Sequence, residues 1–277
     1  MTLRERDVDL ADGSLHLVER GAGLPLILLH GITAGARIWD PVAERLARRF
    51  RPIALDQRGH GLSATRSGGY DARAYVRDVL GVLDALDIGR AVLVGHSLGS
   101  RNVLEAGATG HPAVAGVVAI DFTPFVETAK FDALDRRVSA GDTAFEGPDA
   151  VKAYLAGRYP RLPPDAIGRR AEHCYRPGED GLWRPRAVAA AMADTCAGLR
   201  ADLAPALRAI SVPALLVRGA DSAFVSAEAF ARARALRPDL GAVTVEGADH
   251  YVPEVQPERT AALVESFVDG LGPAGLS

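Results

Sequence analysis

The sequence predicts an α/β fold in which a mostly parallel sheet is covered by helices on both faces and interrupted by one helical insertion. Short apolar runs of strand length alternate with longer segments that carry apolar residues at helical spacing. The alternation breaks once, between Phe122 and Ile210, where helical patterns and turn signals occur without a convincing strand. A stretch of that length cannot be a plain loop, so we expect a helical cap there.

Seven short runs are rich in aliphatic residues and bounded by turn residues, as in buried strands. In chain order they cover residues 15–19, 24–29, 52–55, 91–94, 114–120, 213–217 and 242–245. The segments between them repeat apolar residues at helical spacing. These predicted helices cover residues 41–50, 72–86, 98–108, 227–236 and 257–268. Such alternation favours parallel pairing, with helices on both faces of one sheet.

Length and composition indicate one core domain with an insertion. We expect residues 1–124 and 211–277 to form the core and residues 125–210 to form the cap. A chain of 277 residues, 48% of them hydrophobic, can bury a large core. The net charge of −3 argues against a basic surface for nucleic acid or anionic membranes.

The sequence also predicts a cytoplasmic protein. Its N-terminus is charged and lacks an apolar signal core, and no apolar run reaches the roughly 20 residues that a membrane span needs. The two cysteines, Cys174 and Cys196, are too few for a disulfide framework. We expect both to be reduced packing residues.

The string Gly95-His96-Ser97-Leu98-Gly99 follows a predicted strand and precedes a predicted helix. In a strand-to-helix elbow the serine takes a strained backbone position, and flanking glycines avoid collisions with the neighbouring chain. Glycine and serine often share ordinary turns, so the string gains its specificity from the strand and helix around it. Ser97 is therefore the candidate nucleophile.

A serine nucleophile needs a base, and on this kind of scaffold the acid and then the histidine follow it in the chain. His250 lies just after the last predicted strand and before the last predicted helix, where that histidine is expected. His96 lies inside the elbow itself, His111 begins a His-Pro turn and His16 lies in an early strand pattern. His250 is the predicted catalytic base.

Three aspartates compete for the acid that orients the histidine. The commonest place is three residues beyond a glycine in the loop after strand 213–217, but Ser222 holds it and Asp221 is displaced by one. Asp121 directly follows strand 114–120, and from this strand end it could reach the imidazole. The spacing favours Asp121 and leaves Asp221 as the alternative. Asp249 adjoins the histidine and is expected to be a turn residue.

The oxyanion of a tetrahedral intermediate needs two aligned donors. The backbone amide of Leu98, directly after the nucleophile, is one expected donor. The second should come from the string His30-Gly31-Ile32-Thr33, which follows strand 24–29, and we assign it to Ile32. The alternative for this His-Gly pair is a plain β-turn.

No cofactor or metal is expected. Residues 56–63 combine glycines and cations but lack the GxxxxGK pattern of a phosphate loop, so a structural turn that supports the strand ends is the better interpretation. The sequence contains no HExxH, paired CxxC or carboxylate cluster typical of metal sites, and no GxGxxG that opens a helix.

Together these residues resemble the α/β-hydrolase superfamily over nearly the whole chain. The resemblance implies an α/β-hydrolase fold: a mostly parallel eight-stranded sheet, helices on both faces and a helical cap inserted after strand 6. Residues 119–124, 153–160 and 247–252 resemble more closely the 2-(acetamidomethylene)succinate hydrolase family of bacterial vitamin B6 degradation. In that family the triad acid is similar in position to Asp121, in agreement with the spacing.

This resemblance implies a serine hydrolase that cleaves an enamide carrying two carboxylates, through an acyl-enzyme, to acetate, ammonia, carbon dioxide and succinate semialdehyde. It also implies that cap arginines hold the carboxylates, and the similar positions are Arg137, Arg158 and Arg170, with Tyr159 beside them. A dianion leaving water requires bidentate guanidinium partners. The alternative is that these are solvated cap arginines.

Two other functions remain open. One is a carbon-carbon bond hydrolase or carboxylesterase on the same scaffold, and the other is a hydrolase-fold ligand receptor that uses the triad only for slow covalent sensing. The expected partner is a small carboxylated molecule rather than nucleic acid or membrane. A homodimer is compatible with the sequence but cannot be inferred from it.

Overall fold

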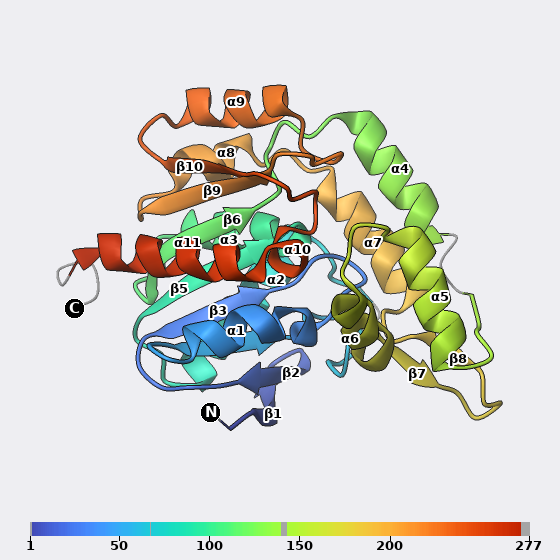
Figure 1. The fold of residues 1–277 in the computed structure, drawn as a ribbon. Helices are drawn as coiled ribbons and strands as arrows, with labels where there is room; N and C mark the ends of the chain where they lie inside the picture. Colours follow the sequence, from blue (N-terminus) through green and yellow to red (C-terminus); the bar gives the residue numbers. More distant parts are fainter. Residues whose placement is uncertain (1, 67, 140–142, 273–277) are drawn as a thin grey trace.

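The computed structural model describes residues 2–66, 68–139 and 143–272 (Figure 1). Within them, the main sheet has eight strands in the spatial order β1-β2-β4-β3-β5-β6-β9-β10. The strands are β1 (Arg4–Leu10), β2 (Gly13–Glu19), β3 (Pro25–Leu29), β4 (Arg51–Leu55), β5 (Ala91–His96), β6 (Val114–Ile120), β9 (Ala214–Gly219) and β10 (Gly241–Val245). Only the β1–β2 and β2–β4 pairs of this sheet are antiparallel. The predicted mostly parallel, eight-stranded sheet is confirmed.

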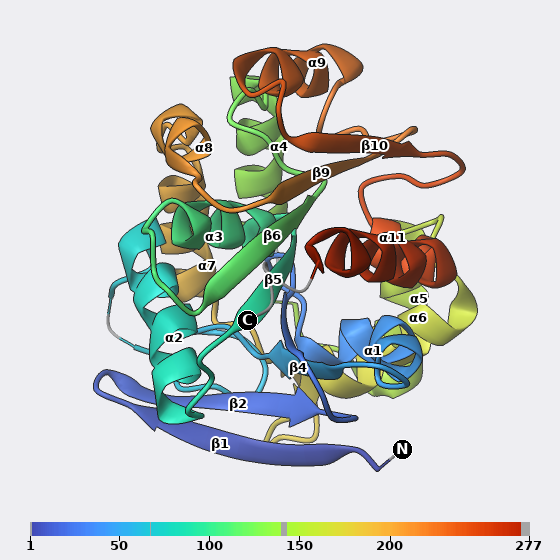
Figure 2. The same cartoon turned by 90° about the vertical axis from the view of Figure 1, so that its left-hand side faces the viewer.

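Helices cover both faces of this sheet (Figure 2). One face carries α1 (Asp40–Leu46) and α11 (Pro257–Gly270), and the other carries α2 (Ala72–Ala85), α3 (Leu98–Gly107), α8 (Ala204–Ala209) and α9 (Ala227–Leu236). Two short helices complete the core, η1 (Ala36–Trp39) and α10 (Val252–Val255). No helix among the described residues is both long and apolar enough to cross a bilayer.

The central strands are buried on both faces, so their side chains divide between two cores. Leu93 of β5 and Ile27 of β3 point into the core beneath α2 and α3. Their neighbours Val92, Val94 and Leu28 point into the core beneath α1 and α11. This alternation is the two-residue period of a strand, and burial of both faces explains why these strands read as continuous apolar runs.

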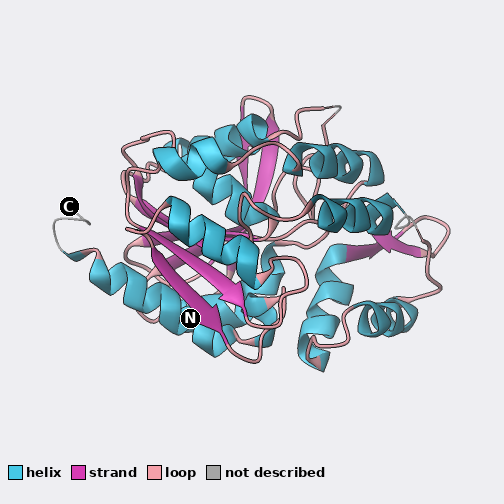
Figure 3. Ribbon diagram, turned by 90° about the horizontal axis from the view of Figure 1, so that it is seen from above, coloured by secondary structure: helices cyan, strands magenta, loops and turns pink. Residues whose placement is uncertain are grey.

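The insertion follows β6, as predicted. Its helices α4 (Thr128–Ser139), α5 (Pro148–Arg158), α6 (Pro164–Cys174) and α7 (Ala189–Leu199) gather beyond the carboxyl ends of the strands (Figure 1). Ligands bind at that edge in open α/β sheets. The expectation that the stretch lacks strands is wrong, because β7 (Tyr175–Pro177) and β8 (Trp183–Pro185) pair as a small antiparallel hairpin away from the main sheet (Figure 3). Each has three residues and ends in proline, which hides the strand pattern.

Strand β1 is missing from the seven predicted strands. It begins with Arg4-Glu5-Arg6-Asp7 and is mostly exposed, so it carries almost no apolar signal. Its backbone pairs with β2 along its full length, from Arg4 opposite Glu19 to Leu10 opposite Gly13. Charged side chains on an edge strand discourage pairing with other chains. Because these charges replace the apolar residues of an ordinary strand, the sequence of β1 resembles that of a loop.

Candidate active site

Ser97 lies on the sharp turn between β5 and α3, with φ 54° and ψ −113°. A Cβ atom on Gly95 would come within 2.2 Å of the backbone of Gly99, and one on Gly99 would come within 2.2 Å of the Leu29 carbonyl oxygen. Both positions therefore exclude every residue except glycine. The two glycines hold the Ser97 side chain at the start of α3, above the carboxyl ends of the strands.

Ser97, His250 and Asp121 form one hydrogen-bonded chain. The Ser97 Oγ lies 3.1 Å from His250 Nε2, and His250 Nδ1 lies 2.7 Å from Asp121 Oδ2. Asp121 is fully buried and has a positive φ of 57°, which turns its side chain from the end of β6 toward the histidine. The arrangement has the geometry of a serine-histidine-aspartate triad, in which the acid fixes the tautomer of the ring.

The other two aspartates lie elsewhere. Asp221 is half exposed and forms an ion pair of 2.8 Å with Arg161, and Asp249 Oδ1 accepts a hydrogen bond from the Tyr251 amide.

Sequence reasoning missed Ser222, whose hydroxyl donates to Asp121 Oδ2 at 2.5 Å. The feature of the sequence that could have pointed to Ser222 is its position, because it occupies the commonest place for the triad acid. The Gly219 amide, at 2.9 Å, donates to the other carboxylate oxygen.

The two predicted oxyanion donors belong to segments that adjoin Ser97, because Leu98 follows it in the chain and Gly31, which precedes Ile32, packs against it. Among the described residues, no acceptor takes the N–H of Ile32 or of Leu98, although both residues are buried. The residue after Ile32, Thr33, has φ 62° and donates its N–H to His60 Nε2 at 3.2 Å. Burial lowers the pKa of His60 to about 3, so this imidazole is neutral and can accept. The loop of residues 56–63 therefore supports the oxyanion loop.

His96 supports the histidine rather than the serine. Its Nε2 lies 2.7 Å from the backbone oxygen of His250, so it donates to that carbonyl. Burial, with the neighbouring His250, keeps the pKa of His96 well below its ordinary value, and the ring is neutral. His96 thus holds the backbone of the residue whose side chain faces Ser97.

The predicted substrate-binding arginines differ in whether a carboxylate already balances their charge. Arg170 is buried and forms a two-pronged ion pair with Glu254 of α10, at 2.8 Å and 2.5 Å. Its guanidinium also lies 4.8 Å from the ring centre of Tyr159 and 5.2 Å from that of Tyr251. This charge is already balanced, so Arg170 connects the cap helix α6 to the core.

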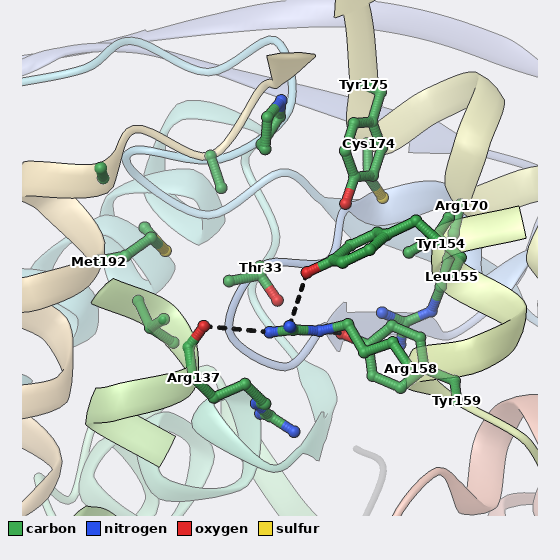
Figure 4. A pocket seen from close by; sticks show the side chains of 14 residues that line it. Thr33, Arg137, Tyr154, Leu155, Arg158, Tyr159, Arg170, Cys174, Tyr175 and Met192 are labelled. Carbon is green, nitrogen blue, oxygen red and sulfur yellow. Dashed lines mark hydrogen bonds between the residues drawn. The ribbon is translucent and has the colours of Figure 1, made fainter. Parts of the chain in front are cut away.

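Arg137 and Arg158 form no ion pair with a carboxylate among the described residues. Arg158 donates to the hydroxyls of Tyr159 and Tyr154 at 3.1 Å and 2.7 Å, and to the Arg137 carbonyl at 3.4 Å (Figure 4). Arg137 donates to the Tyr251 hydroxyl at 3.2 Å. Burial would raise the pKa of Tyr159, but the charges of Arg170, Arg137 and Arg158 outweigh it and lower that pKa.

Two cavities share Arg137 as a lining residue. The smaller, of about 40 Å³, lies among Thr33, Arg137, Arg158, Tyr159 and Arg170, and Thr33 directs its hydroxyl toward it (Figure 4). The larger, of about 340 Å³, contains Ser97 and His250. Within the described chain, no three His, Cys, Asp or Glu side chains are grouped so that they could bind a metal ion.

Comparison with known proteins agrees with this geometry. A profile of the Alpha/beta hydrolase family matches residues 26–263. The chain belongs to the alpha/beta hydrolase family. This alpha/beta hydrolase is 51% identical over 264 residues to 2-(acetamidomethylene)succinate hydrolase of Mesorhizobium japonicum, covering 95% of each chain. A crystal structure of E-2-(acetamidomethylene)succinate hydrolase superposes with a TM-score of 0.94 at 50% identity, covering 97% of this chain and all of the other.

A more distant relative is N-formylmaleamate deformylase of Pseudomonas putida, which is 30% identical over 260 residues and 90% of each chain. Together these relatives support hydrolysis of an amide bond on this alpha/beta hydrolase scaffold.

Replacing Asp121 and Asp221 in turn should show which of them is the triad acid. Asp121→Asn is expected to lower kcat about ten-thousandfold, because the ring loses the carboxylate that fixes its tautomer. Asp221→Asn removes only a half-exposed ion pair and should leave kcat within about twofold. Steady-state assays of both variants check this. A larger loss in Asp221→Asn than in Asp121→Asn would exclude Asp121 as the acid.

Ser222→Ala should lower kcat about tenfold while the protein still folds. A hydrogen bond to a charged group contributes about 1.5–3 kcal/mol, and part of that orients Asp121 toward the histidine. The measurement is kcat between pH 6 and 9, together with a thermal melt. Ser222→Thr keeps the hydroxyl and is the matched control. Equal kcat in Ser222→Ala and the parent would show that the hydroxyl only packs the loop.

Proposed function

We propose that this protein is a serine amidase that hydrolyses 2-(acetamidomethylene)succinate, an enamide with two carboxylates. The observation that carries the proposal is the pair of arginines, Arg137 and Arg158. Both line one cavity without a carboxylate partner among the described residues, and Arg137 also lines the cavity of Ser97. Unpaired guanidinium groups in a half-buried cavity favour an anionic ligand. The 51% identity to an enzyme of that name supports the same substrate.

Arg158 has the donors that a carboxylate needs. A guanidinium carries five N–H groups, and three are used: Nε on Tyr159, one of Nη1 on Tyr154 and one of Nη2 on the Arg137 carbonyl. One N–H remains on each terminal nitrogen. Each of these two N–H groups can donate to a carboxylate oxygen, and the existing bonds fix the plane of the guanidinium before substrate arrives.

Arg137 supplies the second contact. Its Nε is buried and has no hydrogen-bond partner within the described residues. A buried, unpaired donor on a cation is costly and is rare in folded proteins. Arg137 also lines both cavities, so it stands between the arginine cavity and Ser97. We infer that the second carboxylate of the substrate takes this donor.

The chemistry follows from the hydrogen-bonded chain at Ser97. His250 Nε2 accepts the proton of the Ser97 hydroxyl as its oxygen attacks the acetyl carbonyl, and Asp121 stabilises the imidazolium. The amides of Ile32 and Leu98 stabilise the oxyanion. The C–N bond breaks as His250 returns the proton to nitrogen, leaving acetyl-Ser97 and an enamine.

Water activated by His250 then releases acetate from Ser97. The freed enamine takes up water and loses ammonia, which leaves an aldehyde with a carboxylate in the β position. Decarboxylation of that product gives succinate semialdehyde and carbon dioxide. These last steps follow from the chemistry of the product, so the protein needs residues only for amide cleavage.

We also propose that residues 125–210 act as the cap domain over a core of residues 1–124 and 211–277. The cap supplies Arg137, Arg158, Arg170 and Tyr159, whereas the core supplies the groups that react. Two features support a cytoplasmic location: the small polar substrate, and the buried cysteines Cys174 and Cys196, which form no disulfide with each other.

The amide should be hydrolysed by the parent protein and not by Ser97→Ala. We expect acetate and ammonia in equal amounts from 2-(acetamidomethylene)succinate, with kcat in the ordinary enzyme range of about 1–1,000 per second. p-Nitrophenyl acetate and a vinylogous diketone acid serve as comparison substrates for an esterase or a carbon-carbon bond hydrolase. Preference for either would exclude the proposed substrate, and turnover far below one per second would favour a ligand receptor.

Arg158→Lys should raise KM for the dicarboxylate at least tenfold and leave KM for p-nitrophenyl acetate within about twofold. Lysine keeps the charge but cannot present two parallel donors. Arg136→Lys, at an exposed position on α4, is the matched control. Equal changes for the charged and the neutral substrate would contradict carboxylate recognition by Arg158.

A further inference from the structure

The larger cavity is lined by Ser97 and His250, whereas the arginine cavity is lined by neither of them. Arg137 is the one described residue that lines both. A substrate whose carboxylates occupy the arginine cavity places its carbonyl carbon at Ser97. The group attached to that carbonyl then points away from the carboxylates, into the larger cavity.

One face of α4 forms a wall of this cavity. Lys130, Ala133, Leu134 and Arg137 follow the spacing i, i+3, i+4 and i+7, which places them in one row along the helix. The facing wall comes from the loop after β9, and α4 stands beside that loop in Figure 1. The same helix face therefore carries a carboxylate-binding cation at one end and an apolar surface next to it.

Between its polar groups, which include Lys130, Arg137 and Asp249, the cavity has an apolar lining and small exposed side chains. Leu134 is buried and Phe224 is partly buried, with its ring centre 4.9 Å from that of His250. Ala133 and Ala223, on the two opposing walls, are exposed. A chain that starts at Ser97 can thus pass Leu134 and Phe224 and reach solvent between two alanines.

We propose that this cavity is an acyl channel and that the enzyme also hydrolyses homologues of its enamide with unbranched acyl groups longer than acetyl. The inference rests on the proposed function, which sets the direction of the substrate. A methyl group displaces about the volume of one water, about 30 Å³, so an acetyl group fills a small part of the 340 Å³. The reaction is unchanged: the C–N bond breaks, the nitrogen takes the proton, and water cleaves the acyl-Ser97 ester to the longer acid.

The test is a series of acetyl, propanoyl, butanoyl and hexanoyl enamides with the same succinate part. We expect kcat/KM to stay within tenfold of the acetyl value or to rise, because each methylene that contacts the channel lowers KM by up to about fourfold. A loss of more than about a hundredfold at propanoyl or butanoyl, as in a closed pocket, would overturn the channel. If the acetyl compound itself is not hydrolysed, the proposed function fails instead.

Ala133→Phe tests the path of the chain. A phenyl ring at the opening should lower the ratio of hexanoyl to acetyl kcat/KM at least tenfold. Ala156→Phe, at an exposed position of α5 outside the residues that line either cavity, is the matched control and should leave that ratio unchanged. An equal ratio in the two variants would show that longer chains do not leave between α4 and the loop after β9.

Discussion

The close approach of α3 to β3 is the constraint on which the rest of the candidate site depends. At Gly99 the helix backbone lies so near the Leu29 carbonyl that no side chain fits, and at Gly31 a Cβ atom would lie 3.2 Å from both His96 Nδ1 and Ser97 Cβ. This approach brings the Leu98 amide at the start of α3 next to the loop that carries the Ile32 amide. The positive φ of Ser97 then directs its hydroxyl to the same point. One helix position, which only glycine permits, therefore sets both the candidate nucleophile and its oxyanion donors.

The three cap arginines differ in whether their charges are balanced by a carboxylate. The Arg170–Glu254 pair is buried and neutral overall, and it joins α6 to α10, which begins two residues after His250. A buried ion pair is weak evidence for net stability, since desolvation of both charges opposes their attraction. Its clearer effect is to fix the cap against the segment that carries the histidine. Arg137 and Arg158 have no comparable partner among the described residues, and their charges, together with the larger effect of Arg170, lower the pKa of Tyr159. A site with two unbalanced cations favours a dianion over a neutral ester or amide.

Local patterns in the sequence were enough to predict seven of the eight strands of the main sheet, the longer core helices and the positions of Ser97 and His250 between them. They favoured Asp121 but left Asp221 as an alternative, because the choice depends on which side chain turns toward the histidine ring. Ser222 was visible as a departure from the usual acid position, but its hydrogen bond to Asp121 joins residues 101 positions apart and leaves no local trace. No pattern in the sequence indicated that Glu254 would pair with Arg170. The three cap arginines also look alike in the sequence. In the structure Arg170 is paired with a carboxylate, whereas Arg137 and Arg158 are not, and this difference depends on long-range packing.

The two parts of the site come from two parts of the chain, and α4 determines how they fit together. The core fixes the reacting atoms through buried strands and glycine contacts that allow little movement. The cap presents Arg137 and Leu134 from one face of α4, three residues apart, so a carboxylate contact and an apolar contact are held at a constant separation. A shift of α4 would move both relative to Ser97 at once. On the proposed function, the position of α4 therefore sets the distance from the carboxylate at Arg137 to the scissile carbonyl, but it does not limit the length of the acyl group beyond that carbonyl.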